Sequence, residues 1–254
     1  MGCKNSTPAP QGTLLEQYAG AQLPQPWSTD YENDFEKQIY MAINLCRHDP
    51  KKFVPHVRAV YKDHVLLKGV GTKMNDLIAK LQATETLSVV RFDGQANEAA
   101  RQNNTEVVDK NEDVPTKGGN IAKLTAASGE DKSASCFEFT MPKFEGSTGT
   151  EFVALQLALD FEDFDKPKEQ KDAPTEAVPA EGEAQANAID APDKGEAEAD
   201  KAAAAPAKKA TVVPGSSPIL DAGVELVGIS NKAHKKCKNV IQVLYCKAAT
   251  NALV

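Results

Sequence analysis

The 254-residue chain contains no run of about eighteen apolar residues, the length that a membrane-spanning helix requires. Its amino-terminal region also lacks the apolar stretch and small-residue cleavage site of a secretory signal peptide. We therefore expect a protein that is neither secreted nor transmembrane. The five cysteines are an odd number without metal-ligand spacing, which predicts reduced thiols in a cytosolic compartment. Cys46, Cys136 and Cys246 stand beside apolar residues and are predicted to be small core residues.

The motifs of common catalytic centres are also missing. The sequence has no P-loop, no G-x-G-x-x-G and no G-x-S-x-G. The histidines are His48, His56, His64 and His234. His48 and His56 lie on Lys-rich helical sequence and are predicted to be solvated, while His234 is surrounded by lysines, which disfavours a metal cation. We therefore predict no catalytic residue, no metal ligand and no cofactor.

The chain begins Met-Gly-Cys-Lys-Asn-Ser, which fits the pattern M-G-x-x-x-[ST] for N-myristoylation of Gly2. A single myristoyl chain binds membranes with an association constant of only about 10⁴ M⁻¹, so stable anchoring needs a second signal. Cys3 supplies a thiol beside the acylated glycine, where palmitoylation would add a second chain. We predict that Gly2 and Cys3 are lipid attachment sites on the cytosolic face of a plasma, flagellar or Golgi membrane.

Acidic residues are concentrated in one part of the chain. Residues 160–200 carry 14 Asp and Glu against 4 Lys, although the whole chain has a net charge of −7. The remainder is therefore mildly basic and would not be repelled by an anionic membrane. Residues 166–210 are rich in Ala, Glu, Lys and Pro, and cannot bury enough apolar surface to offset about 1–2 kcal/mol of backbone entropy per residue. We predict a disordered insertion there, and an acylated flexible tether over residues 1–28.

Hydrophobic periodicity predicts that helices precede strands. Thr29 and Glu32 have capping-box spacing, and an apolar stripe follows that Asp49-Pro50 would end. That stripe consists of Phe35, Ile39, Ile43 and Cys46. Further helices are predicted over residues 51–61, 74–81 and 96–107 and after Gly149, and strands over 135–141, 225–229 and 240–246. This order predicts an α+β fold with a small antiparallel sheet flanked by helices.

Three segments resemble the CAP superfamily of cysteine-rich secretory proteins, antigen 5 and pathogenesis-related 1, also called the SCP domain. Residues 35–53, FEKQIYMAINLCRHDPKKF, are similar to its opening helix, with N-x-x-R-x-D-P-x-x-F in place. Residues 87–100, LSVVRFDGQANEAA, resemble a second family helix. Residues 216–234, SSPILDAGVELVGISNKAH, resemble the family's R-x-N-I followed by V-G-I-A and a histidine. The first motif is carried by Asn44, Arg47, Asp49, Pro50 and Phe53.

The resemblance implies an α-β-α sandwich formed by residues 29–165 and 211–254. Many members hold a divalent metal in a cleft of two histidines and two acids, but both histidines are missing from this chain. The acid of the family's G-E-N-I corresponds either to Gly119 or to Glu138, and Asp160 lies in a segment similar to the family's L-L-I-D-D-G. We therefore expect Glu138 and Asp160 to be residual acids of an altered cleft without metal.

These observations predict a non-enzymatic, lipid-anchored module that acts through lipids or an unknown protein partner. No nucleic-acid partner is predicted. The turn between the last two strands carries Lys232, Lys235, Lys236 and Lys238, which are predicted to contact anionic headgroups. One alternative is a hydrolase-like enzyme that uses Glu138 and Asp160. Another is a structural component of a membrane-associated cytoskeletal assembly.

Overall fold

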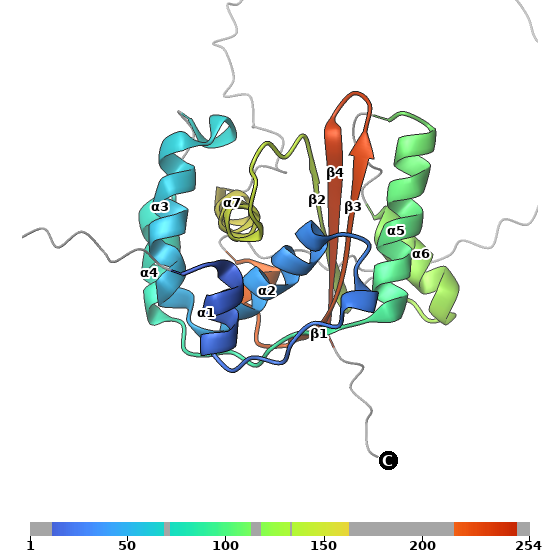
Figure 1. Ribbon diagram of the computed structural model, residues 1–254. Helices are drawn as coiled ribbons and strands as arrows, with labels where there is room; N and C mark the ends of the chain where they lie inside the picture. Colours follow the sequence, from blue (N-terminus) through green and yellow to red (C-terminus); the bar gives the residue numbers. More distant parts are fainter. Residues whose placement is uncertain (1–11, 69–71, 113–117, 133, 163–215, 248–254) are drawn as a thin grey trace, which may run out of the picture. The chain divides into compact units, whose positions relative to one another are not determined.

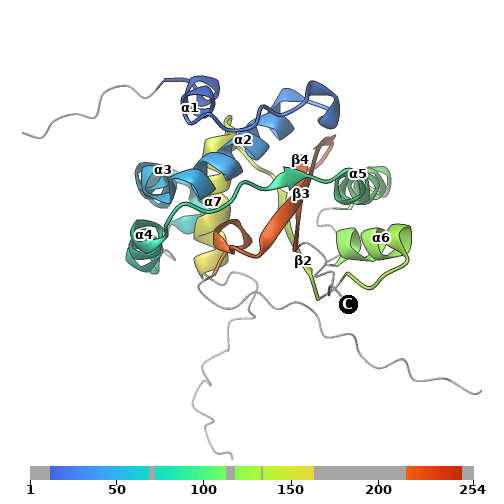
Figure 2. The same ribbon diagram turned by 90° about the horizontal axis from the view of Figure 1, so that it is seen from below.

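A four-stranded sheet with helices on both of its faces forms the folded part of the chain (Figures 1 and 2). The computed structural model describes residues 12–68, 72–112, 118–132, 134–162 and 216–247. The predicted disordered insertion and the acylation sites Gly2 and Cys3 lie outside the described residues. Short 3-10 turns connect the main elements at η1 (Ser28–Asp30), η2 (Pro50–Phe53), η3 (Val65–Leu67) and η4 (Pro218–Leu220).

The sheet is mixed and has the strand order β1-β3-β4-β2. Its strands are β1 (Arg91–Phe92), β2 (Cys136–Pro142), β3 (Val224–His234) and β4 (Lys238–Lys247). The three predicted strands are antiparallel neighbours, but β1 pairs in parallel with β3, so the prediction of a purely antiparallel sheet was wrong. A two-residue strand is too short to show a period of two, so β1 was not recognised in the sequence. Its parallel partner β3 comes only after a long crossover connection, so no local turn indicates the pairing.

One face of the sheet is covered by α5 (Gly94–Asp109) and α6 (Gly119–Ser128) (Figure 1). The predicted small-residue face of α5 lets it lie close to β3. A methyl group at Gly228 would be 2.3 Å from the carbonyl carbon of Ala96, so only glycine fits there. The buried stripe of α5 comprises Ala96, Ala99, Ala100 and Val107.

The opposite face packs against α2 (Asp34–His48) and α7 (Gly149–Glu162), with α3 (Val54–Asp63) and α4 (Met74–Ala83) outside them (Figure 2). Because α7 lies between the sheet and α3, it is apolar on nearly every side. Its buried apolar residues are Phe152, Val153, Ala154, Leu155, Leu157, Ala158 and Phe161.

The first described helix, α1 (Leu14–Gly20), lies inside the segment that was predicted to be a flexible tether. Thr13 and Glu16 form a capping box, in which the backbone N–H of Thr13 donates to the Glu16 carboxylate at 2.7 Å. Tyr18 is fully buried, and its hydroxyl donates to the Pro24 carbonyl at 2.8 Å. The predicted tether was therefore too long. The T-x-x-E spacing of a capping box is present, but the prolines on both sides of this short helix favoured an extended segment.

The helix α2 carries the predicted apolar stripe and ends where Asp49-Pro50 was expected to end it. Its start was wrongly predicted at Thr29. The N-cap is Asn33, whose side chain accepts a hydrogen bond from the backbone N–H of Glu36 at 3.0 Å. Asn33 also donates to the Asn231 carbonyl of β3 at 3.2 Å, a long-range contact that local spacing does not reveal.

Arg47 of α2 has no exposed surface, although it is one of the largest polar side chains in the chain. Its Nε donates to the Ser88 carbonyl at 2.7 Å. Its two terminal nitrogens donate at 2.9 Å to the carbonyls of Ile219, Asp221 and Val224. Burial lowers the pKa of the guanidinium, and the nearby Asp221 carboxylate opposes that shift. One side chain thus joins α2 to the segment before β1 and to the chain that leads into β3.

We predict that Arg47→Met lowers the free energy of unfolding by about 3–5 kcal/mol, because four carbonyls lose their donor and those of Ile219 and Val224 are buried. Arg58→Met is the matched control, since Arg58 is exposed on α3 and should change stability by less than about 0.5 kcal/mol. Urea unfolding followed by circular dichroism measures both. Equal stability of the two variants would contradict the assigned role of Arg47.

Candidate functional site

The two acids predicted to share a cleft lie on opposite faces of the sheet. Glu138 of β2 faces α6, where its carboxylate accepts hydrogen bonds from the backbone N–H of Gly118 and, at 3.2 Å, from that of Asn120. Asp160 lies on α7 and accepts a hydrogen bond from the Ser217 hydroxyl. The structure therefore does not bring Glu138 and Asp160 together. Glu138 fixes the start of α6, and Asp160 fixes the chain just before η4.

A network of buried side-chain amides lies beside Glu138, between α5, α6 and β4. Asn103 donates from Nδ2 to Asn120 Oδ1 at 2.9 Å and to Gln242 Oε1 at 2.8 Å. Gln242 in turn donates to Asn104 Oδ1 at 2.8 Å. Asn104 then donates to the Ser230 hydroxyl at 3.0 Å. Gln242 is therefore the centre of the network, with both polar atoms of its amide in use.

Gly119, the alternative position for the family's acid, begins α6 rather than a strand. A Cβ atom there would lie 2.6 Å from Asn103 Oδ1, so a glutamate at this position would collide with the network. Amide groups do not titrate near neutral pH and are not the preferred ligands of zinc. The amide network can hold α5, α6 and β4 in register, but its amides can serve neither as a general acid nor as a general base.

Metal-ligating side chains do not cluster in the part of the chain that the structure describes. No group of three or more His, Cys, Asp or Glu residues lies close enough there to hold a metal ion. His234 is buried and accepts hydrogen bonds at Nδ1 from the backbone N–H groups of Lys236 and Cys237, at 3.2 and 3.1 Å. This imidazole therefore shapes the β3–β4 turn.

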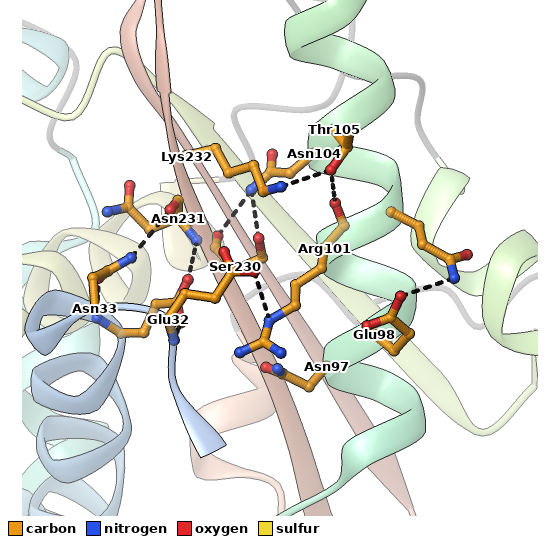
Figure 3. Close-up of polar contacts among 12 residues, drawn as sticks. Glu32, Asn33, Asn97, Glu98, Arg101, Asn104, Thr105, Ser230, Asn231 and Lys232 are labelled. Atoms are coloured by element: carbon orange, nitrogen blue, oxygen red, sulfur yellow. Dashed lines mark hydrogen bonds and ion pairs between the residues drawn. The ribbon is translucent and has the colours of Figure 1, made fainter. Parts of the chain in front are cut away.

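A shallow polar groove of about 410 Å³ lies between α5 and β3 (Figure 3). Arg101 Nε lies 3.4 Å from a Glu32 carboxylate oxygen. Lys232 Nζ donates to the Thr105 hydroxyl at 2.7 Å. The protein itself therefore partners both cations of the groove, and Lys232 contacts α5 instead of extending with the lysines of the turn.

At one side of this groove, Glu36 joins the start of α2 to β3. Its carboxylate is fully buried and accepts hydrogen bonds from the backbone N–H groups of Asn231 and Glu32 at 2.7 and 2.8 Å. Burial raises the pKa of Glu36, and the two backbone donors oppose that shift. The group has no exposed surface, so its contribution is to fix the α2–β3 junction.

The predicted basic turn is the tip of the β3–β4 hairpin. Lys235 and Lys236 are exposed there. Lys238 is also exposed, and its Nζ lies 3.1 Å from the Glu145 carboxylate. The four lysines predicted to contact lipid thus divide into Lys232, held against α5, and three at the tip of the hairpin.

A cavity of about 940 Å³ lies between α1, α2, α3 and the start of α7. It contains His56 and His64. His56 was predicted to be solvated, but it is only partly exposed. Burial lowers the pKa of both imidazoles, and the Glu151 and Glu145 carboxylates oppose the shift of His64. Leu15 and Val65 line the cavity and are 53% and 66% exposed. The cavity therefore combines neutral imidazoles, carboxylates and an apolar border.

The predicted acylation sites Gly2 and Cys3 are not placed by the structure, because the described residues begin at residue 12. Among the described residues, none of the helices has the length and apolar character needed to cross a bilayer.

No family model matches the chain, and no curated protein or solved structure matches it either. The resemblance to the CAP superfamily therefore rests on the three sequence segments alone.

The amide network was missed in the sequence analysis, although a signal was present. Asn103 and Asn104 continue the stripe of Ala96, Ala99, Ala100 and Val107, so two polar residues stand at positions of a helix that face the core. Buried amides require partners, and those partners come from α6 and β4, far away in the sequence. The stripe indicates that the asparagines are buried, but not what they contact.

We predict that Gln242→Leu lowers the free energy of unfolding by about 2–4 kcal/mol, because it leaves Asn103 and Asn104 buried without this partner. Gln102→Leu is the matched control. Gln102 is exposed on α5 and donates only to Glu98, at 3.0 Å, so its loss should cost less than about 0.5 kcal/mol. Chemical denaturation compares the variants, and a Gln242→Leu protein as stable as the control would exclude the network as a stabilising element.

Proposed function

We propose that this chain is a non-enzymatic, lipid-anchored CAP-like module that acts on the cytosolic face of a membrane by contacting lipids or a protein partner. The observation that carries the proposal is the amino-terminal Met-Gly-Cys-Lys-Asn-Ser, with a glycine for myristate and a cysteine for palmitate. One chain alone binds reversibly, and two give stable anchoring.

The beginning of the folded unit supports a position close to the bilayer. The described chain starts at Gly12, and α1 follows at once. Nine residues separate Gly2 from Gly12, so the Cα atoms of these two glycines lie at most about 36 Å apart even in a fully extended chain. A tether of 28 residues would let the module move much farther from the surface. The shorter connection keeps the folded unit within reach of the headgroups.

The exposed lysines at the tip of the β3–β4 hairpin support contact with anionic lipid. Lys235 and Lys236 are exposed at the turn, and a lysine near an anionic surface contributes about 1 kcal/mol to binding. Surface charges act over a Debye length of only about 8 Å at physiological salt, so the tip must lie against the headgroups to contribute. The tip and the acylated end would then hold the module at two points.

The arrangement of helices on both sides of a small sheet agrees with the α-β-α sandwich that the resemblance implies, and we propose the CAP architecture for this chain on that basis. The amide network occupies the surroundings of Gly119 and Glu138, where the family places an acid. Glu138 and Asp160 contact different neighbours on opposite faces, which favours a binding module over a hydrolase that combines them.

Substitution of the acylation sites tests the anchor. In cells, Gly2→Ala should release most of the protein from membranes into the cytosol, because it removes the myristate and the site beside which Cys3 is palmitoylated. Cys3→Ser should weaken retention without abolishing it. Fractionation followed by immunoblotting measures both, with Ser6→Thr as the control that preserves the motif.

Unchanged membrane recovery of both variants would refute the anchor, as would an unmodified terminus in the intact mass of the native protein. Tight stoichiometric zinc binding, or turnover in a hydrolase screen, would contradict the non-enzymatic part of the proposal.

The hairpin contact is tested with unacylated protein and vesicles that contain phosphatidylserine. Lys235→Gln with Lys236→Gln should weaken co-sedimentation about thirtyfold, the equivalent of about 2 kcal/mol. The control double variant, Lys51→Gln with Lys80→Gln, removes the same charge from exposed positions on η2 and α4 and should bind almost as wild type does. Equal losses in the two double variants would show that only net charge matters.

A further inference from the structure

Two cysteines face each other across neighbouring strands of the sheet. Cys136 is the first residue of β2, and the register places it directly opposite Cys246 near the end of β4. Both side chains point to the α5–α6 face, where they pack with Ala96, Ala99, Leu124 and Leu244. The pair therefore belongs to a small core separate from the one that contains Cys46.

The hydrogen-bond pattern brings the two thiols as close as antiparallel strands allow. The backbone N–H of Lys247 donates to the Ser135 carbonyl at 2.8 Å, so Ser135 and Lys247 form a hydrogen-bonded pair next to the two cysteines. Cys136 and Cys246 consequently form a non-hydrogen-bonded pair, for which the Cα atoms lie about 4.5 Å apart and the side chains are closer. Disulfides span Cα separations of about 4.4–6.8 Å, so the spacing expected for this pair falls within the range that a disulfide can bridge.

The surroundings make the two sulfurs chemically different. The Cys246 side chain opposite it, the Ser135 hydroxyl, whose oxygen lies 3.9 Å from the Cys136 sulfur, and the Lys132 ammonium lower the pKa of Cys136. The Cys136 side chain and burial raise the pKa of Cys246. Cys46 has no such neighbour, and burial raises its pKa. Among these three thiols, Cys136 is therefore the one that most readily becomes a thiolate.

The position of Cys136 also gives a small oxidant a route. The residue is only 1% exposed, but it begins an edge strand of the sheet, and Ser135 and Lys132 beside it are partly exposed. Strand ends open locally at much lower free energy than the whole fold. Hydrogen peroxide, which has only two heavy atoms, can then reach the sulfur.

We propose that Cys136 and Cys246 form a reversible disulfide when the protein meets a hydroperoxide, so that this thiol pair is an oxidation site of the folded module. The proposal does not depend on acylation or on the CAP resemblance.

The chemistry balances in two steps. The Cys136 thiolate attacks one peroxide oxygen, the O–O bond breaks, and the departing hydroxide takes up a proton as water, which leaves a sulfenic acid. The Cys246 sulfur then attacks the Cys136 sulfur and loses its proton, while the S–O bond breaks and a second water leaves. Two thiols are oxidised and one peroxide is reduced. A dithiol such as dithiothreitol restores the pair by thiol–disulfide exchange.

Oxidation should change the stability of the module. The new bond would close a loop of about 110 residues, and cross-links of that length stabilise strongly by restricting the unfolded chain. It would also join the first residue of the edge strand β2 covalently to β4. We expect the melting temperature of the oxidised protein to rise by about 5–10 °C.

The test uses the purified full chain with Cys3→Ser, so that the terminal thiol cannot cross-link two molecules. After hydrogen peroxide treatment and alkylation, peptide mapping should recover a linked pair of peptides that contain Cys136 and Cys246, and dithiothreitol should abolish it. The Cys246→Ser variant should instead accumulate a dimedone-reactive Cys136. Cys237→Ala, the control, should form the same disulfide and show the same rise in melting temperature.

Peroxide treatment that leaves both thiols free for alkylation would overturn the proposal. So would a cross-link that joins Cys136 to a different cysteine, or irreversible oxidation of Cys136 without a disulfide. Mapping of the protein with both cysteines decides the question even if Cys246→Ser does not fold.

Discussion

The buried guanidinium of Arg47 is the contact on which the rest of the fold depends. Its acceptors are backbone carbonyls rather than a carboxylate. The buried cation therefore keeps its hydrogen-bond partners only while α2 and the segments that supply the carbonyls remain in place. Its acceptors Ile219 and Val224 lie 172 and 177 residues away along the chain. The contact therefore joins the amino-terminal helical layer to the carboxyl-terminal hairpin, and the elements that carry the candidate surfaces are placed by it.

The sheet divides the polar chemistry of the molecule into two separate regions. On one side, Gln242 links the amides of Asn103 and Asn104, and Glu138 is occupied at the start of α6. On the other side, Asp160 contacts Ser217. The imidazoles of His56 and His64 lie elsewhere, in the cavity beside α1. Glu138, Asp160 and the two imidazoles of the cavity therefore lie in separate parts of the described structure.

The features that could be predicted from the sequence are those that produce a periodic pattern of apolar residues. The stripe of Ile39, Ile43 and Cys46 identified α2, and the small residues of α5 identified its close approach to the sheet, because a period is visible within one element. Burial of Cys46, Cys136 and Cys246 was also predicted, and it is confirmed. These predictions depended on local pattern alone.

Features that depend on distant partners were not predicted. β1 is too short to have a period, and its parallel direction is set by β3. The pairing of Cys136 with Cys246 depends on strand register, and the separation of Glu138 from Asp160 depends on which layer each element joins. The CAP resemblance and the acylated terminus remain predictions, because neither the described residues nor any matched protein bears on them.

The contact between Asp160 and Ser217 joins two residues that are 57 positions apart in the chain. Asp160 lies near the end of α7, and Ser217 comes directly before η4, where the Ile219 carbonyl accepts a hydrogen bond from Arg47. Cleavage of one peptide bond between Asp160 and Ser217 would therefore leave the carboxyl-terminal hairpin attached to α2 and α7 through these side chains.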